Sequence, residues 1–248
     1  SSSPTLTNCT FTSNSARSGG GMRNSSSSPT LTNCTFASNS ASNNGGGMNN
    51  NYSSSPTLTN CTFTSNSADY GGGMNNSGSS SPTLTNCTFT SNLADYGGGM
   101  YNSSSSPTLT NCTFTSNLAD YGGGMRNSSS SPTLTNCTFT SNSADYGGGM
   151  YNSSSSPTLT NCNFCGNVDG SGFNSISGDA INGSSSGNNL LDAACVFGDI
   201  NFDGVANLAD RTPFNTLIGV CDADINGDGE VNGADMAFIL SWWGPCIP

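Results

Sequence analysis

The sequence predicts an all-β fold, a parallel β-helix of seven coils with about 25 residues each, followed by a small α-helical domain. Seven near-identical blocks built around the string S-P-T-L-T-N-C-T-F fill the first two-thirds of the chain. Self-similarity at a fixed period of this size is typical of solenoids, in which one repeat cannot bury its own apolar face. Each block contributes one cysteine at the same position. These cysteines, spaced 25, 27, 26, 25, 25 and 25 residues apart, are Cys9, Cys34, Cys61, Cys87, Cys112, Cys137 and Cys162.

The block from 107 to 131 shows how one coil is built. Residues 108–110 and 112–115 alternate polar and apolar side chains, as strands with one buried face do. Leu109 and Cys112 are three residues apart, so they cannot share a face of one straight strand. A bend at Asn111 restores the phase, because asparagine tolerates the left-handed conformation. With the glycine-rich turn that follows, we expect two or three short strands in each coil.

Stacked coils place identical residues above one another, about 4.8 Å apart. We therefore expect rows of Leu, Cys, Phe and Met to form the core, with Ile181 completing the methionine row. The cysteines of this row should be mostly free thiols, since buried cysteine behaves as a small hydrophobe. A row of asparagines through Asn111 should hydrogen-bond along the axis. In the block described above, the core positions are Leu109, Cys112, Phe114 and Met125.

Composition and charge exclude several classes of function. The chain has a net charge of −11 and contains neither Lys nor His. Nucleic acid is therefore not an expected partner, because four arginines cannot replace the phosphate counterions. No apolar run reaches the length of a membrane span. Eleven cysteines, four of them outside the repeat register, indicate disulfide chemistry in an oxidising, extracellular compartment. Because the chain opens with Ser in mid-repeat, we expect a processed form or a fragment.

The repeat resembles that of polymorphic outer-membrane proteins. The strings F-x-S-N, at 114–117, and G-G-G-M, at 122–125, are similar to the F-x-x-N and G-G-A-[I/L/V] pair of that family, with Gly in place of Ala. The resemblance covers residues 1–182. It implies a right-handed β-helix that is displayed at a cell surface.

The acidic end of the chain contains two 12-residue segments, 199–210 and 224–235. Both place oxygen donors at loop positions 1, 3, 5, 9 and 12, a backbone carbonyl at position 7 and Gly at position 6, the pattern of a calcium loop. An apolar stretch with helical spacing follows each loop. We therefore expect two calcium ions, the first at Asp199, Asn201, Asp203, Val205, Asn207 and Asp210, and the second at Asp224, Asn226, Asp228, Glu230, Asn232 and Asp235.

This duplicated loop-helix unit resembles the type I dockerin module, with Asp rather than Glu at position 12. The resemblance covers residues 195–248 and implies two bound calcium ions, folding coupled to metal, and a cohesin-like partner. Positions 10 and 11 of the loops are Leu208-Ala209 and Gly233-Ala234, without the hydroxyl pair common in cellulosomal members. Spacing leaves the disulfide connectivity open among the cysteines that flank the two units, which are Cys195, Cys221 and Cys246.

Two kinds of outward-facing row offer alternative functions for the repeats. One row holds the carboxylates Asp69, Asp95, Asp120 and Asp145, which a polysaccharide-active β-helix enzyme would require. We interpret them as turn residues instead, because a catalytic site is a unique constellation and every coil here is the same. The other rows are the outward threonines of the T-x-T strings, whose flat arrays are similar to those of ice-binding β-helices.

The sequence thus favours three parts, a β-helix over 1–183, a linker or partial coil over 184–194, and a double calcium-loop domain over 195–248. We expect a non-enzymatic, secreted or cell-surface rod that is stabilised by calcium and assembles head-to-tail into a fibre or acts as an adhesin. Trp242 and Trp243 are the candidate interface residues. An ice-binding protein and a polysaccharide-binding or polysaccharide-active protein anchored by the dockerin-like module are the alternatives.

Overall fold

The computed structural model describes residues 3–170, 176–178 and 190–191 of the chain, and every regular element in this part is a β-strand. The chain divides into two units, Ser1–Asp192 and Ala193–Pro248. The calcium loops, Trp242, Trp243, Cys195, Cys221 and Cys246 all lie outside the described residues. The predicted helical domain and its metal sites therefore stay predictions, and the fold described below is that of the repeats.

Each coil contains four strands rather than the two or three that the alternation predicts. In the fifth coil they are β17 (Thr108–Thr110), β18 (Thr113–Thr115), β19 (Leu118–Tyr121) and β20 (Met125–Ser128). The sequence predicts that Ala-Asp-Tyr is part of a turn. Instead Ala119 is buried while its neighbours Leu118 and Asp120 are exposed, so this segment alternates as a strand. The row of Asp residues consequently lies on a sheet face and not in turns.

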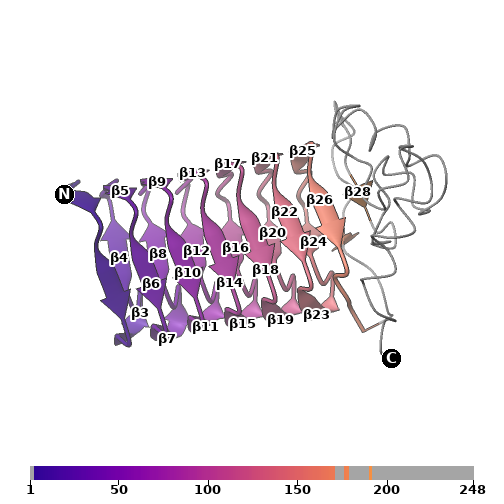
Figure 1. Ribbon diagram of the computed structural model, residues 1–248, viewed down its shortest axis with the longest axis horizontal. Helices are drawn as coiled ribbons and strands as arrows, with labels where there is room; N and C mark the ends of the chain where they lie inside the picture. Colours follow the sequence, from indigo (N-terminus) through magenta and orange to yellow (C-terminus); the bar gives the residue numbers. More distant parts are fainter. Residues whose placement is uncertain (1–2, 171–175, 179–189, 192–248) are drawn as a thin grey trace, which may run out of the picture. The chain divides into compact units, whose positions relative to one another are not determined.

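The strands stack in parallel into four sheets, one coil above the next (Figure 1). Sheet A contains β1 (Thr5–Thr7), β5 (Thr30–Thr32), β9 (Thr57–Thr59), β13 (Thr83–Thr85), β17, β21 (Thr133–Thr135) and β25 (Thr158–Thr160). Sheet B contains β2 (Thr10–Thr12), β6 (Thr35–Ala37), β10 (Thr62–Thr64), β14 (Thr88–Thr90), β18, β22 (Thr138–Thr140), β26 (Asn163–Cys165) and β28 (Leu190–Leu191).

The other two sheets flank the triple glycine. Sheet C contains β3 (Ser15–Ser18), β7 (Ser40–Asn44), β11 (Ser67–Tyr70), β15 (Leu93–Tyr96), β19 and β23 (Ser143–Tyr146). Sheet D contains β4 (Met22–Ser25), β8 (Met48–Asn51), β12 (Met74–Ser77), β16 (Met100–Ser103), β20, β24 (Met150–Ser153) and β27 (Ile176–Gly178). The described part thus has six complete coils and an incomplete seventh, where the sequence predicted seven.

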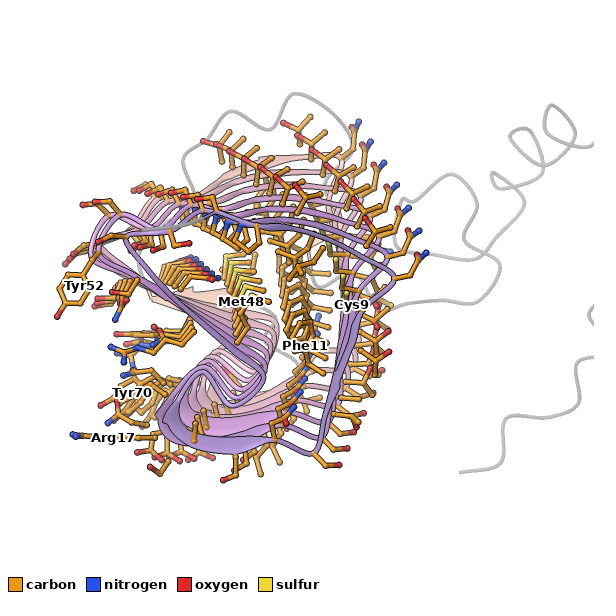
Figure 2. The ribbon with its side chains drawn as sticks, turned by 90° about the vertical axis from the view of Figure 1, so that its left-hand side faces the viewer. Cys9, Phe11, Arg17, Met48, Tyr52 and Tyr70 are labelled. Atoms are coloured by element: carbon orange, nitrogen blue, oxygen red, sulfur yellow. The ribbon has the colours of Figure 1, made fainter. Side chains whose placement is uncertain are left out.

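The core consists of rows of identical side chains. Leu109, Cys112, Phe114 and Met125 are each at most 1 % exposed, and the same four positions are buried from the second to the sixth coil. Consecutive Phe rings stack almost parallel, with 4.7 Å between the centroids of Phe89 and Phe114. Figure 2 shows the rows end-on, with Cys9, Phe11 and Met48 pointing inward. Ile176, not Ile181, follows Met150 in the methionine row, because β27 pairs with β24 in that register.

Asparagine residues form the bends between strands, and they also occupy part of the interior. Asn111 has a φ of 54°, which supplies the predicted bend, and its amide donates to Asn86 Oδ1 at 3.1 Å. Two further rows are buried, one through Asn117 and one through Asn127. The Nδ2 of Asn117 donates to Asn142 Oδ1 and to the carbonyl of Phe89, both at 2.9 Å. Because buried amides are costly unless they are bonded, these rows fix the register of the coils.

Candidate functional site

Four features of the described coils could carry chemistry, and they are the threonine rows, the aspartate row, the cysteine row and a groove beside the triple glycine. The threonines of sheet A point outward on both sides of the inward-facing leucine in all seven strands. Adjacent strands pair without a register shift, as Thr108 and Thr110 do with Thr133 and Thr135. In sheet B the array is interrupted by Ala37, Asn163 and Cys165. Sheet A is therefore the more regular hydroxyl surface.

The aspartate row runs along the outer face of sheet C. Its four members line a shallow depression of about 370 Å³ together with alanines and the exposed Leu93 and Leu118. Burial raises the pKa of Asp95, and the neighbouring charges of Asp69 and Asp120 raise it further. The four Asp side chains are the only titratable groups of the described coils that line the depression. Within the described residues, no group of three His, Cys, Asp or Glu side chains is arranged to hold a metal ion.

The cysteine row is buried from the second coil on, and the pKa is raised for most of its thiols. Cys34, Cys61, Cys87, Cys112 and Cys137 are free thiols, and the Sγ of Cys112 donates to the carbonyl of Thr110 at 3.4 Å. A hydrogen bond to the Cys137 thiol raises the pKa of Cys112 to about 12, and burial adds to the rise. A hydrogen bond from Cys137 lowers the pKa of Cys162 to about 7. The row is thus a packing element, with its most acidic thiol at the last coil.

Cys165 is disulfide-bonded, unlike the cysteines of the row. It lies at the end of β26, at a position that threonine occupies in most of the other strands of sheet B. This agrees with the expectation that cysteines outside the repeat register take part in disulfide chemistry.

The groove was not predicted from the sequence. Two rows of side chains face each other across the triple glycine of each coil. We call the row at the end of sheet C the tyrosine row, and it consists of Ser18, Asn44, Tyr70, Tyr96, Tyr121 and Tyr146. We call the row at the second residue of each sheet D strand the variable row, and it consists of Arg23, Asn49, Asn75, Tyr101, Arg126 and Tyr151.

The glycines allow the two rows to approach. Gly122 has a φ of 70°, and a Cβ at this position would lie 2.3 Å from the carbonyl oxygen of Met125. Only glycine fits such a reversal, so the strand that leaves the turn runs back close to the strand that enters it. As a result, the ring centroids of Tyr70 and Tyr101 are 5.4 Å apart.

One arginine is held among the rings. The guanidinium carbon of Arg126 lies 4.3 Å from the ring centroid of Tyr96 and 5.2 Å from that of Tyr121. These distances are those of cation–π contacts. In coils four to six the groove is therefore filled by aromatic and guanidinium groups. The groove could have been recognised in the sequence from the second residue of each sheet D strand, because this residue varies from coil to coil within an otherwise uniform repeat.

Comparison with known proteins identifies the fold family. The family model described as "Right handed beta helix region" matches residues 1–164. The chain belongs to the right-handed β-helix family. The family match confirms the handedness that the repeat resemblance implied, and it leaves the activity of this β-helix protein open. The described part contains no helix that is long and apolar enough to cross a membrane.

The remaining comparisons add little. No curated protein matches the sequence. A similar solved structure is that of trypsin-treated QnrB1, a plasmid-mediated fluoroquinolone resistance protein. It is 15 % identical, with 72 % of this chain and 90 % of that chain covered and a TM-score of 0.20. A likeness this slight carries no argument for this β-helix.

Proposed function

We propose that this β-helix protein is an extracellular structural rod that assembles into fibres or serves as the stalk of an adhesin. The observation that carries the proposal is the uniformity of the coils. All four sheets keep the same strand register through six coils, apart from one irregularity where β7 meets its neighbours in sheet C. A solenoid of uniform coils is a stiff rod, and it presents the same surface repeatedly along one axis.

Head-to-tail stacking is the mode of assembly that we propose. In the first coil Leu6, Phe11 and Met22 are only partly buried, whereas the same rows are fully buried from the second coil on. Any further coil stacked on this edge would bury them, as each coil does for its neighbour, and in the proposed fibre that coil belongs to a second copy. Because such a contact does not close on itself, it generates a filament.

Calcium supplies the joint in this proposal. The two predicted loops offer carboxylate, amide and carbonyl oxygens, the hard ligands that calcium prefers. Folding of the C-terminal module would be coupled to the ions, as it is in other small metal-dependent domains. Trp242 and Trp243 would contact the neighbouring copy. A cohesin-like domain or a cell-surface polysaccharide is the alternative partner for this module.

Electron microscopy of the purified chain tests the rod. We expect filaments in millimolar calcium that separate into single rods when a calcium chelator is added. Filaments that survive excess chelator would contradict the calcium joint. Single particles at every calcium and protein concentration would contradict self-assembly. Replacing Asp199 and Asp224 with Ala should reproduce the effect of the chelator without one being added.

The threonine surface of sheet A supports a second candidate function, ice binding. Two unbroken columns of threonine run along seven strands at the regular strand spacing. Thermal hysteresis of the purified protein tests this candidate. Thr110→Tyr on sheet A should abolish the hysteresis, and Thr115→Tyr on sheet B is the matched control. Equal hysteresis in both variants, or none in the native protein, would rule the candidate out.

A further inference from the structure

The tyrosines of the chain gather in the groove. Six of the seven lie there, four in the tyrosine row and two in the variable row. The seventh, Tyr52, is 66 % exposed and projects away from the coil (Figure 2). The groove rings are not required for the β-helix, because the first two coils carry Ser18 and Asn44 in the tyrosine row and no ring in the variable row. A cluster of phenols that the fold does not need is a candidate for chemistry.

Two pairs of rings meet across the groove, each formed by residues of consecutive coils. The ring centroids of Tyr70 and Tyr101 are 5.4 Å apart, with 46° between the planes. Those of Tyr121 and Tyr151 are also 5.4 Å apart, with 72° between the planes. Between these two pairs the variable row carries Arg126, so that a guanidinium and not a phenol packs on the tyrosine row there. The groove thus holds one phenol pair on either side of an arginine.

Neighbours within the tyrosine row lie closer together, but their positions do not suit a bond between the rings. The rings of Tyr70 and Tyr96 are 5.0 Å apart and within 15° of parallel, on adjacent strands about 4.8 Å apart. When two phenols are joined at the carbons next to their hydroxyls, the two Cβ atoms lie on the outer sides of the joined rings, farther apart than adjacent strands. The backbones of Tyr70 and Tyr101 are separated by one coil and by the width of the groove. There is therefore room for such a bond across the groove and not along the row.

From this geometry we infer that the groove is a site of oxidative cross-linking, in which Tyr70 joins Tyr101 and Tyr121 joins Tyr151 as dityrosine. The oxidant is hydrogen peroxide, acting through a heme peroxidase. Each phenol gives up one electron and its hydroxyl proton, and the two phenoxyl radicals couple through one carbon–carbon bond ortho to the oxygens. The hydrogen at each coupled carbon then moves to the phenol oxygen of its own ring. The electrons and protons released by one pair reduce one molecule of hydrogen peroxide to two of water.

These bonds would tie coil three to coil four and coil five to coil six. All four side chains are only half-buried, so their ring edges can be oxidised in the folded protein. A cross-link stabilises mainly by restricting the unfolded chain, since the native state already holds the two residues together. We therefore expect the oxidised protein to unfold at a higher urea concentration. The inference goes beyond the structural role and does not depend on it, because each pair lies within one chain.

Peptide mapping of the full chain after treatment with a heme peroxidase and hydrogen peroxide tests the pairing. At micromolar protein concentration we expect dityrosine fluorescence and one cross-linked peptide for each pair in the mass spectrum. Each such peptide should be lighter by two hydrogens than the sum of its parts. Cross-links through the exposed Tyr52 would join separate molecules, so their yield should fall on dilution, whereas the yield of the groove bonds should not.

Residues taken from other coils make the test specific. Tyr101→Asn installs the residue that coils two and three carry at this position, so it should abolish the bond to Tyr70 and leave the bond between Tyr121 and Tyr151. Tyr96→Asn is the matched control, because it removes a ring stacked on Tyr70 and installs the residue that coil two carries. Both bonds should form in this control. Circular dichroism before oxidation verifies that each variant folds.

Three outcomes would overturn the inference. The first is the absence of intramolecular dityrosine in the native protein under conditions that oxidise Tyr52. The second is a cross-linked peptide that joins stacked neighbours of the tyrosine row, such as Tyr70 and Tyr96. The third is an unchanged yield of dityrosine in Tyr101→Asn. Filament assembly is measured without peroxide, so failure here is distinguishable from failure of the rod.

Discussion

The interior rows and the groove rows are made by the same coils, yet they differ in one respect. The buried Leu, Cys, Phe and Met positions are the same in every complete coil, whereas the variable row reads Arg, Asn, Asn, Tyr, Arg, Tyr. An interior side chain packs mainly against its own copies above and below, so a change in one coil must be matched by the next. A groove side chain contacts solvent or a different row, so it can change in one coil without a matching change in the next.

The comparison indicates where to look for function in a uniform solenoid. Rows that repeat without change report the packing of the fold. Rows whose residues differ between coils, although the strand register is the same, are not needed for packing and are therefore candidates for a function. By this criterion the groove, with Arg23, Asn49, Tyr101 and Arg126, is the most informative surface of the described coils, more so than the threonine or aspartate rows.

The most severe way to break an interior row is to remove one ring. Phe114→Ala should destabilise the β-helix by about 3–5 kcal/mol, because the side chain is fully buried between Phe89 and Phe139. Urea denaturation monitored by circular dichroism measures the change. Thr115→Ala, the outward neighbour, should stay within about 0.5 kcal/mol of the native protein. Comparable losses in the two variants would contradict the inward stacking on which the whole fold depends.

Removing one amide from a buried asparagine row should cost less than removing a ring. Asn117→Ala takes away the acceptor of both the backbone N–H and the Nδ2 of Asn92. At about 1–3 kcal/mol for an unsatisfied buried group, we expect a loss of about 2 kcal/mol in the free energy of unfolding. The control for the amide is Asn111→Gly, which removes an exposed amide without straining the left-handed backbone at this position. A loss as large for Asn111 would mean that position within the row, and not burial, decides the cost.

How much of this could be read from the sequence depends on the kind of residue. Leu109 and Phe114 were predictable as core because apolar alternation has one interpretation in a strand. The bend at Asn111 followed from a mismatch of phase, and the φ of 54° confirms it. Asn117 and Asn127 were not predictable as core. An isolated asparagine indicates a turn, and only its copies in the coils above and below supply its partners.

The fourth strand and the groove were missed for a related reason. Ala119 is too small to give a clear apolar signal between Leu118 and Asp120, so the sequence predicts a turn where the structure has a strand. The approach of the two groove rows depends on the reversal at the triple glycine, which composition alone does not give. Calcium binding remains a prediction from loop spacing, because its residues lie outside the described part.

A groove substitution sharpens the comparison from the other side. Tyr101→Asn should change the free energy of unfolding by less than about 1 kcal/mol, because two earlier coils carry Asn at that position and Tyr101 is only half-buried. The same denaturation experiment measures it. Met100→Asn, one residue earlier and fully buried, is the matched control and should lose several kcal/mol. A large loss for Tyr101→Asn would mean that the variable row is structural after all.

The smallest effect should come from the aspartate row, where stacking like on like brings equal charges together. Burial first, and then the charges of Asp69 and Asp120, raise the pKa of Asp95. The native state therefore holds this proton more tightly than the unfolded chain does. Stability should increase slightly as the pH falls from neutral through the range in which Asp95 protonates, somewhat above its ordinary value near 4. At pH 7, Asp95→Asn should raise the melting temperature slightly, and the gain should disappear once Asp95 is protonated in the native protein.

Asp120→Asn tests the cause of this shift directly. The substitution removes one of the two like charges, so the pKa of Asp95 should move toward its ordinary value, as NMR titration of the side-chain carboxyl would show. Thr110→Asn, on sheet A, is a control that leaves the aspartate row intact. If the Asp95 pKa were the same with and without Asp120, the charge of Asp120 would not contribute to the shift. The charges of neighbouring carboxylates in the row would then not interact, and stacking one carboxylate above another would carry no electrostatic cost.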